Sequence, residues 1–157
     1  MASRRKSRER ALQVIFLCDL GKLETDSAIE AFYVTLHSED EDFSRLGRDR
    51  FMEELVVGTM GRREEIDEEI GRSSEHWRLD RMPSVDRNIL RLATFELLDA
   101  KLPSAVVIDE ALELARRFSG NESVGFVNGV LDSIKARHGK PAGKARGAGV
   151  SLADTEG

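Results

Sequence analysis

Apolar residues recur every three or four positions along most of the chain, which is the spacing of one face of an α-helix. The first such run predicts an amphipathic helix over about Ser7–Leu20, which Gly21 would close as a C-cap. Thr25 or Asp26 is a suitable N-cap for a second helix. The apolar stripes of these two helices comprise Ala11, Leu12, Ile15 and Leu20, and then Ile29, Phe32, Tyr33 and Leu36.

Two further helices are predicted before the middle of the chain. One extends from about Leu46 to Met60 and carries a regular apolar stripe. Gly61 marks a break, because glycine weakens a helix interior. A fourth helix follows, with Ile66 and Ile70 one turn apart on the same face.

The most apolar helix is predicted from Val85 to Leu98, where apolar side chains cover nearly every face. Pro83 suits the entry of this helix, and Ser84 is a plausible N-cap. A helix that is apolar on most sides is usually central and packs on several neighbours. Pro103 would end the segment. An apolar clamp is predicted ahead of the helix, formed by Trp77, Leu79 and Met82.

Two more helical runs complete the pattern, "VVIDEALELARRF" and "VGFVNGVLDSIKARH", with the turn "GNES" between them. Gly125 and Gly129 would let a partner helix come close, at a propensity cost of about 1 kcal/mol each. After His138 the periodicity stops, and the small, polar residues predict a disordered tail over 139–157. We therefore expect an all-α domain of about seven helices over residues 1–138.

The composition points to a soluble, cytoplasmic protein. Cys18 is the one cysteine, so an internal disulfide is impossible, which fits a reducing compartment. No apolar run approaches the roughly 18 residues of a membrane span. The basic N-terminus resembles the start of a signal peptide, but Asp19, Lys22 and Glu24 follow too soon.

The search for catalytic chemistry argues against an enzyme. The chain has no phosphate-binding loop, no dinucleotide fingerprint and no H-E-x-x-H motif. His37, His76 and His138 stand alone, without neighbours at metal-ligand spacing, so we expect no metal and no cofactor. Glu96 lies within the most apolar helix, where pairing with an arginine or with backbone N–H groups is a better interpretation than catalysis.

Positive charge is concentrated at the N-terminus, although the whole chain has a net charge of −5. Five of the first ten residues are basic: Arg4, Arg5, Lys6, Arg8 and Arg10. Cations in the first turn of a helix oppose its dipole by about 0.3–1 kcal/mol each. A phosphate ligand would convert that cost into affinity, whereas a frayed, solvated arm is the alternative interpretation.

Aromatic residues favour the binding interpretation. Phe16 lies on the same predicted helix as the basic residues, and Phe118 and Phe126 flank the turn "SGNESVG". Phenyl rings stack on unpaired bases, which is the usual way that single-stranded RNA is read. Each ring alone is more often a core residue, but basic residues together with rings are what single-strand binding requires.

Several long strings resemble the NusB family of bacterial transcription antitermination factors. They are "RRKSRERALQVIF", "FMEELVVGTM", "MPSVDRNILRLATFELL", "LPSAVVIDEALELARRF" and "FVNGVLDSI", in family order from about Arg4 to Ile134. The resemblance implies two small packed helical bundles. It also implies binding of the boxA element of nascent RNA together with the small-subunit ribosomal protein NusE. RNA polymerase and other Nus factors would be indirect partners.

The resemblance assigns roles to individual positions. The basic residues Arg4, Arg5, Lys6 and Arg8 would hold phosphates, and Arg72 could replace an aromatic residue that some relatives carry near Ser73. The base-contacting surface would comprise Phe16, Phe118, Glu122, Ser123 and Phe126. Asp86 and Arg91 would meet the ribosomal protein, and Glu96 would be structural.

Two alternatives stay open at this point. The same helical domain occurs fused to ribosomal RNA cytosine methyltransferases, but this chain has no room for a methyltransferase domain. Some family members self-associate, so a homodimer that hides the RNA surface is also compatible with the sequence.

Overall fold

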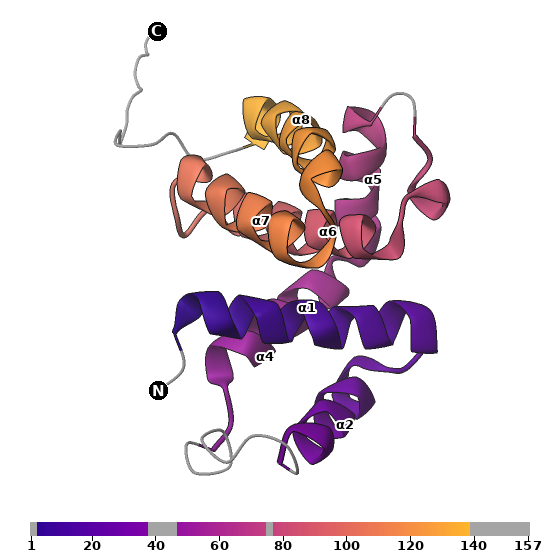
Figure 1. Ribbon diagram of the computed structural model, residues 1–157, viewed down its shortest axis with the longest axis vertical. Coiled ribbons are helices and arrows are strands. Elements are labelled where there is room, and N and C mark those ends of the chain that lie inside the picture. Colours follow the sequence, from indigo (N-terminus) through magenta and orange to yellow (C-terminus); the bar gives the residue numbers. More distant parts are fainter. Residues whose placement is uncertain (1–2, 38–46, 75–76, 139–157) are drawn as a thin grey trace, which may run out of the picture.

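The chain folds into two groups of helices, and the central helix of one group also packs against the other (Figure 1). The computed structural model describes residues 3–37, 47–74 and 77–138. One group consists of α1, α2 and α4, and the other of α5, α6, α7 and α8, with the short 3₁₀ helix η1 before α6. The bounds are α1 Arg4–Gly21, α2 Thr25–His37, α4 Arg50–Gly61, α5 Arg63–Ser73, η1 Leu79–Arg81, α6 Ser84–Asp99, α7 Ser104–Phe118 and α8 Asn121–His138. The predicted all-α fold with two small bundles is confirmed.

Helix α6 occupies the centre, as its apolar sequence predicted. It packs against α7, α8 and α5 in its own group and against α1 and α4 in the other. Ile89, Leu90, Leu92 and Leu97 are at most 1% exposed. Because both groups bury apolar surface on α6, this helix fixes their relative position.

Two helix ends differ from the prediction. Gly21 lies inside α1, and Lys22 takes the left-handed conformation that ends the helix, with φ of 54°. Ser84 is the first residue of α6 rather than its N-cap, and Pro83 takes the capping position without a side-chain hydrogen bond. At the other end of α6, Ala100 adopts φ of 57° and its amide donates to the Glu96 carbonyl.

Helix α4 begins later than its apolar pattern suggested. It starts at Arg50, and Asp49 is its N-cap, with a side-chain oxygen 2.9 Å from the Met52 amide. The tail predicted after His138 falls outside the described residues. Within the ranges that are described, no helix combines the length and the apolar character needed to cross a bilayer.

The close helix approach occurs at a different glycine from the predicted ones. A Cβ added at Gly125 or Gly129 would meet nothing within 4 Å, so neither glycine lies in a tight helix contact. At Gly58 on α4, by contrast, a Cβ would lie 2.2 Å from Cζ of Phe95. Gly58 therefore lets the Phe95 ring of α6 pack directly against the backbone of α4.

Candidate nucleic-acid interface

The basic residues of α1 divide into a buried set and an exposed set. Arg8 is 4% exposed, and its guanidinium donates to both carboxylate oxygens of Glu96 at 2.8 Å. Burial opposes the charged form of Arg8, but the Glu96 carboxylate outweighs it and raises the pKa of the guanidinium. This side chain joins α1 to α6, and its predicted contact with RNA phosphates stays a prediction. The prediction that Glu96 pairs with an arginine is confirmed.

Arg10 belongs to a second buried junction. Its Nη1 lies 3.0 Å from Oδ2 of Asp49. Ser7 donates its hydroxyl to the same carboxylate, at 2.9 and 2.8 Å to the two oxygens. Since Asp49 also caps α4, this junction fixes the start of α4 against the first turns of α1.

Arg4, Arg5 and Lys6 form the exposed set. Arg5 makes a bidentate pair with Glu110 of α7 at 3.1 and 3.0 Å, and this pair holds the pKa of the Glu110 carboxyl below its usual value. The Arg4 guanidinium lies 4.0 Å from the centre of the Phe51 ring on α4. Lys6 approaches Glu9 at 3.8 Å. Glu110 of α7 and Glu9 of α1 thus offset the unfavourable position of Arg5 and Lys6 at a helix N-terminus.

Two of the three predicted aromatic residues share one groove. Phe16 of α1 and Phe118 of α7 line a groove of about 430 Å³ whose walls are mostly apolar. Phe118 is 40% exposed, so its ring is open to a ligand. The remaining lining residues are Glu9, Leu12, Gln13, Leu17, Phe32, Thr35 and Val85.

Two basic residues that were not predicted as site residues, Arg116 and Arg117, lie at the end of α7 beside this groove. Arg117 pairs with the buried Glu9 at 2.5 Å, and its guanidinium lies 5.6 Å from the centre of the Phe118 ring. Arg116 is exposed and pairs with Glu113. The Arg116–Arg117 dipeptide could have been recognised from the sequence, because basic residues in the last turn of a helix face the same solvent as the turn that follows.

The Asp86 carboxylate holds the turn between α7 and α8 through hydrogen bonds. Ser119 and Ser123 both donate their hydroxyls to this carboxylate, the second at 2.8 Å, and the two hydroxyl oxygens lie 2.7 Å apart. Asp86 is 3% exposed, and its contact with a ribosomal protein stays a prediction. Its carboxylate orders the turn beside Phe118.

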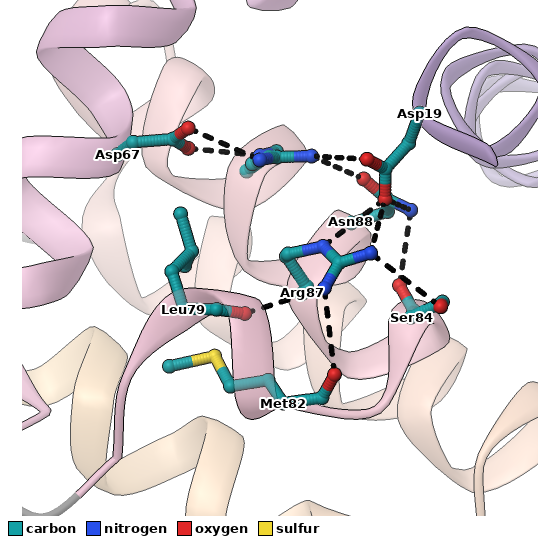
Figure 2. A network of polar contacts seen from close by, with 8 residues as sticks. Asp19, Asp67, Leu79, Met82, Ser84, Arg87 and Asn88 are labelled. Atoms are coloured by element: carbon teal, nitrogen blue, oxygen red, sulfur yellow. Dashed lines mark hydrogen bonds and ion pairs between the residues drawn. The ribbon is translucent and has the colours of Figure 1, made fainter. Parts of the chain in front are cut away.

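Arg91 is likewise buried, and its contact with the ribosomal protein stays a prediction. It is 6% exposed, it donates to both oxygens of Asp67, and it lies 3.4 Å from Asp19. Figure 2 shows how Arg87 and Asn88 of α6 converge on Asp19 of α1, with distances of 2.6–3.1 Å. Burial opposes ionisation of Asp19, but these donors outweigh it and lower the pKa of the carboxyl.

The remaining predicted residues lie apart from the groove that Phe16 lines. Phe126 is partly buried on α8 and makes an edge contact with Trp77, with ring centres 6.0 Å apart. Glu122 is exposed in the first turn of α8. Arg72 is exposed at the end of α5 and pairs with Glu69 at 3.1 Å. Their contacts with RNA stay predictions.

The helical fold agrees with comparisons to known proteins. The NusB family model matches residues 5–136. The NusB transcription antitermination protein of Solibacter usitatus is 51% identical over 141 residues, covering 90% of this chain and 94% of that protein.

Solved structures give the same result. NusB of T. maritima has a TM-score of 0.74 at 33% identity, covering 88% of this chain and 94% of its own. A structure of the antitermination factors NusB and NusE in complex with double-stranded RNA has a TM-score of 0.69 at 27% identity. The match covers 85% of this chain and 96% of that chain. The fold therefore defines an all-α protein built from two groups of helices. This chain belongs to the NusB family.

Proposed function

We propose that this protein is a cytoplasmic transcription antitermination factor that binds boxA RNA together with the ribosomal protein NusE. Binding, and not catalysis, is the proposed activity. The relatives named above are antitermination proteins, and one similar structure contains NusE and RNA. The helical domain at 1–138 would carry the function, with 139–157 as a tail outside it.

One observation carries the proposal. Four exposed cations follow the seam between α1 and α7 and lead to the groove that Phe16 and Phe118 line. They are Arg5, Lys6, Arg116 and Arg117. Cations that neutralise phosphates, next to rings that stack on bases, are the combination that single-strand binding uses. NusE would add contacts of its own and increase the affinity for RNA.

The test is RNA binding measured by fluorescence anisotropy over a series of salt concentrations. The samples are single-stranded boxA RNA, a scrambled strand of equal composition and a duplex, each with and without purified NusE. We expect boxA to bind more tightly than the scrambled strand and NusE to increase that difference. Equal binding of all three RNAs, with and without NusE, would refute the proposed function.

Glu122 gives a more local test. Its carboxylate is exposed in the first turn of α8, where it would repel nearby phosphates. Replacing Glu122 by Gln should strengthen boxA binding at fixed salt, with a loss of helix stability of about 0.3–1 kcal/mol from the dipole. Unchanged or weaker binding would place the RNA away from this turn.

A further inference from the structure

Trp77 is the chain's one tryptophan, and it lies on the surface rather than in the predicted apolar clamp. Its side chain is 51% exposed. The backbone beneath it is nevertheless fixed. The Trp77 amide donates to the Ser74 carbonyl at 3.1 Å, and the Ser74 hydroxyl lies 3.2 Å from the Trp77 carbonyl and 2.7 Å from that of Ile70. The backbone of Trp77 is therefore tied to the end of α5, while its indole is half exposed.

An open pocket with several charged lining residues begins beside this indole. Its volume is about 770 Å³, within the range of about 300–1,000 Å³ that small-ligand sites occupy. The pocket lies between the end of α1, the end of α5, η1 and the start of α6. Its charged lining comprises Lys22, Arg78, Arg87 and Arg91 against Asp19 and Asp80. Positive charge remains in excess even after Asp67, the partner of Arg91, is counted.

The floor of the pocket is a rigid ionic network, and its rim supplies the available charge. Arg87 donates to Asp19 and also to the carbonyls of Leu79 and Met82, at 3.3 and 3.5 Å, so it holds η1 in place (Figure 2). Arg78 pairs with Asp80, but both side chains are about 70% exposed, so this pair is weak. Lys22, the residue that ends α1, also lines the pocket.

We propose that this pocket binds one unpaired nucleotide of the RNA, with the base stacked on Trp77 and the phosphate between Lys22 and Arg78. An aromatic platform next to cations is the chemistry of sequence-tolerant single-strand binding. The pocket also continues the predicted RNA surface, because the indole touches the Phe126 ring. This assignment rests on the proposed function and extends the RNA path from α8 to the end of α1.

The unaltered chain provides the first experiment, because all tryptophan fluorescence comes from Trp77. Single-stranded boxA RNA is titrated while fluorescence and its quenching by acrylamide are followed, with anisotropy of labelled RNA measured in parallel. We expect RNA to change the emission and to protect the indole from acrylamide, with the same saturation point as the anisotropy. RNA that binds by anisotropy without protecting the indole would overturn the site and leave the proposed function intact.

Variants supply the second experiment. Trp77→Leu should weaken RNA binding at least about fivefold, and Trp77→Phe should retain most of the affinity. Val57→Ala is the matched control, since it shortens a similarly exposed apolar side chain on α4. Lys22→Gln should reduce the slope of log affinity against log salt by about 0.7, whereas Lys101→Gln should not.

Three outcomes would reject the proposal. Equal affinity of Trp77→Leu and the unaltered chain would remove the stacking platform. Protection of the indole by NusE in the absence of RNA, with none by RNA alone, would make the pocket a protein-docking site. Absence of RNA binding under every condition, with and without NusE, would remove both this site and the proposed function.

Discussion

The buried pair of Arg8 and Glu96 should contribute strongly to folding, and its disruption gives a quantitative prediction. Arg8→Met removes a guanidinium that satisfies both carboxylate oxygens at 2.8 Å, between side chains that are 5% and 9% exposed. The variant leaves a buried carboxylate without its partner, which costs about 3–5 kcal/mol. For a domain of this size, that cost corresponds to a lower melting temperature by roughly 10 °C.

Urea unfolding followed by circular dichroism measures this effect directly. The cycle comprises the unaltered chain, Arg8→Met, Glu96→Leu and the double variant. We expect each single variant to lose about 3–5 kcal/mol and the double variant to recover most of the loss, because both charges are then absent. A loss below about 1 kcal/mol in Arg8→Met, or no recovery in the double variant, would refute the structural role. The control Arg5→Met, at an exposed pair, should leave stability nearly unchanged.

Three smaller predictions concern the backbone and acid stability. Ala100→Gly should stabilise the chain by about 1 kcal/mol in urea unfolding, because alanine adopts φ of 57° there; a loss would contradict the strain. Gly58→Ala should lower stability by about 1–3 kcal/mol in the same assay, since its Cβ would meet the Phe95 ring at 2.2 Å; full stability would contradict the close packing. Asp19 has a lowered pKa, so its contribution is complete above the ordinary carboxyl pKa of about 4 and disappears as the pH falls through the lowered value. The difference in free energy of unfolding between Asp19→Asn and the unaltered chain should therefore shrink from pH 7 to pH 3. A difference that stays constant over this range would contradict the stabilising role of the ionised Asp19.

The sequence predicted the helices and the central helix because these depend on periodicity along the chain. The α6 segment is apolar on most sides, and this pattern can be recognised without knowing which helices pack against it. Helix ends were less predictable. Lys22 and Ala100 end their helices in the left-handed conformation, which composition assigns to glycine.

The candidate site was harder to predict, because it depends on which charges meet across the fold. Arg8 and Arg5 are similar in sequence, yet Glu96 lies 88 positions from Arg8 and buries it, whereas Arg5 stays exposed beside Glu110. The sequence does not show that Asp86 is buried, because Ser119, whose hydroxyl donates to its carboxylate, is distant along the chain. The exposure of Trp77 was equally unreadable, because an apolar residue before a helix is more often packed.

The most direct test of the RNA-binding seam is the salt dependence of boxA affinity in the double variant Lys6→Gln/Arg116→Gln. Both side chains are about half exposed, so the substitutions remove charge without opening the core. The matched control is Arg62→Gln/Lys101→Gln, which makes the same charge change at the α4–α5 junction and after α6. The account predicts that the slope of log affinity against log salt falls by about 1.4 in the seam variant and stays unchanged in the control. An unchanged slope in the seam variant, or an equal fall in both, would contradict it.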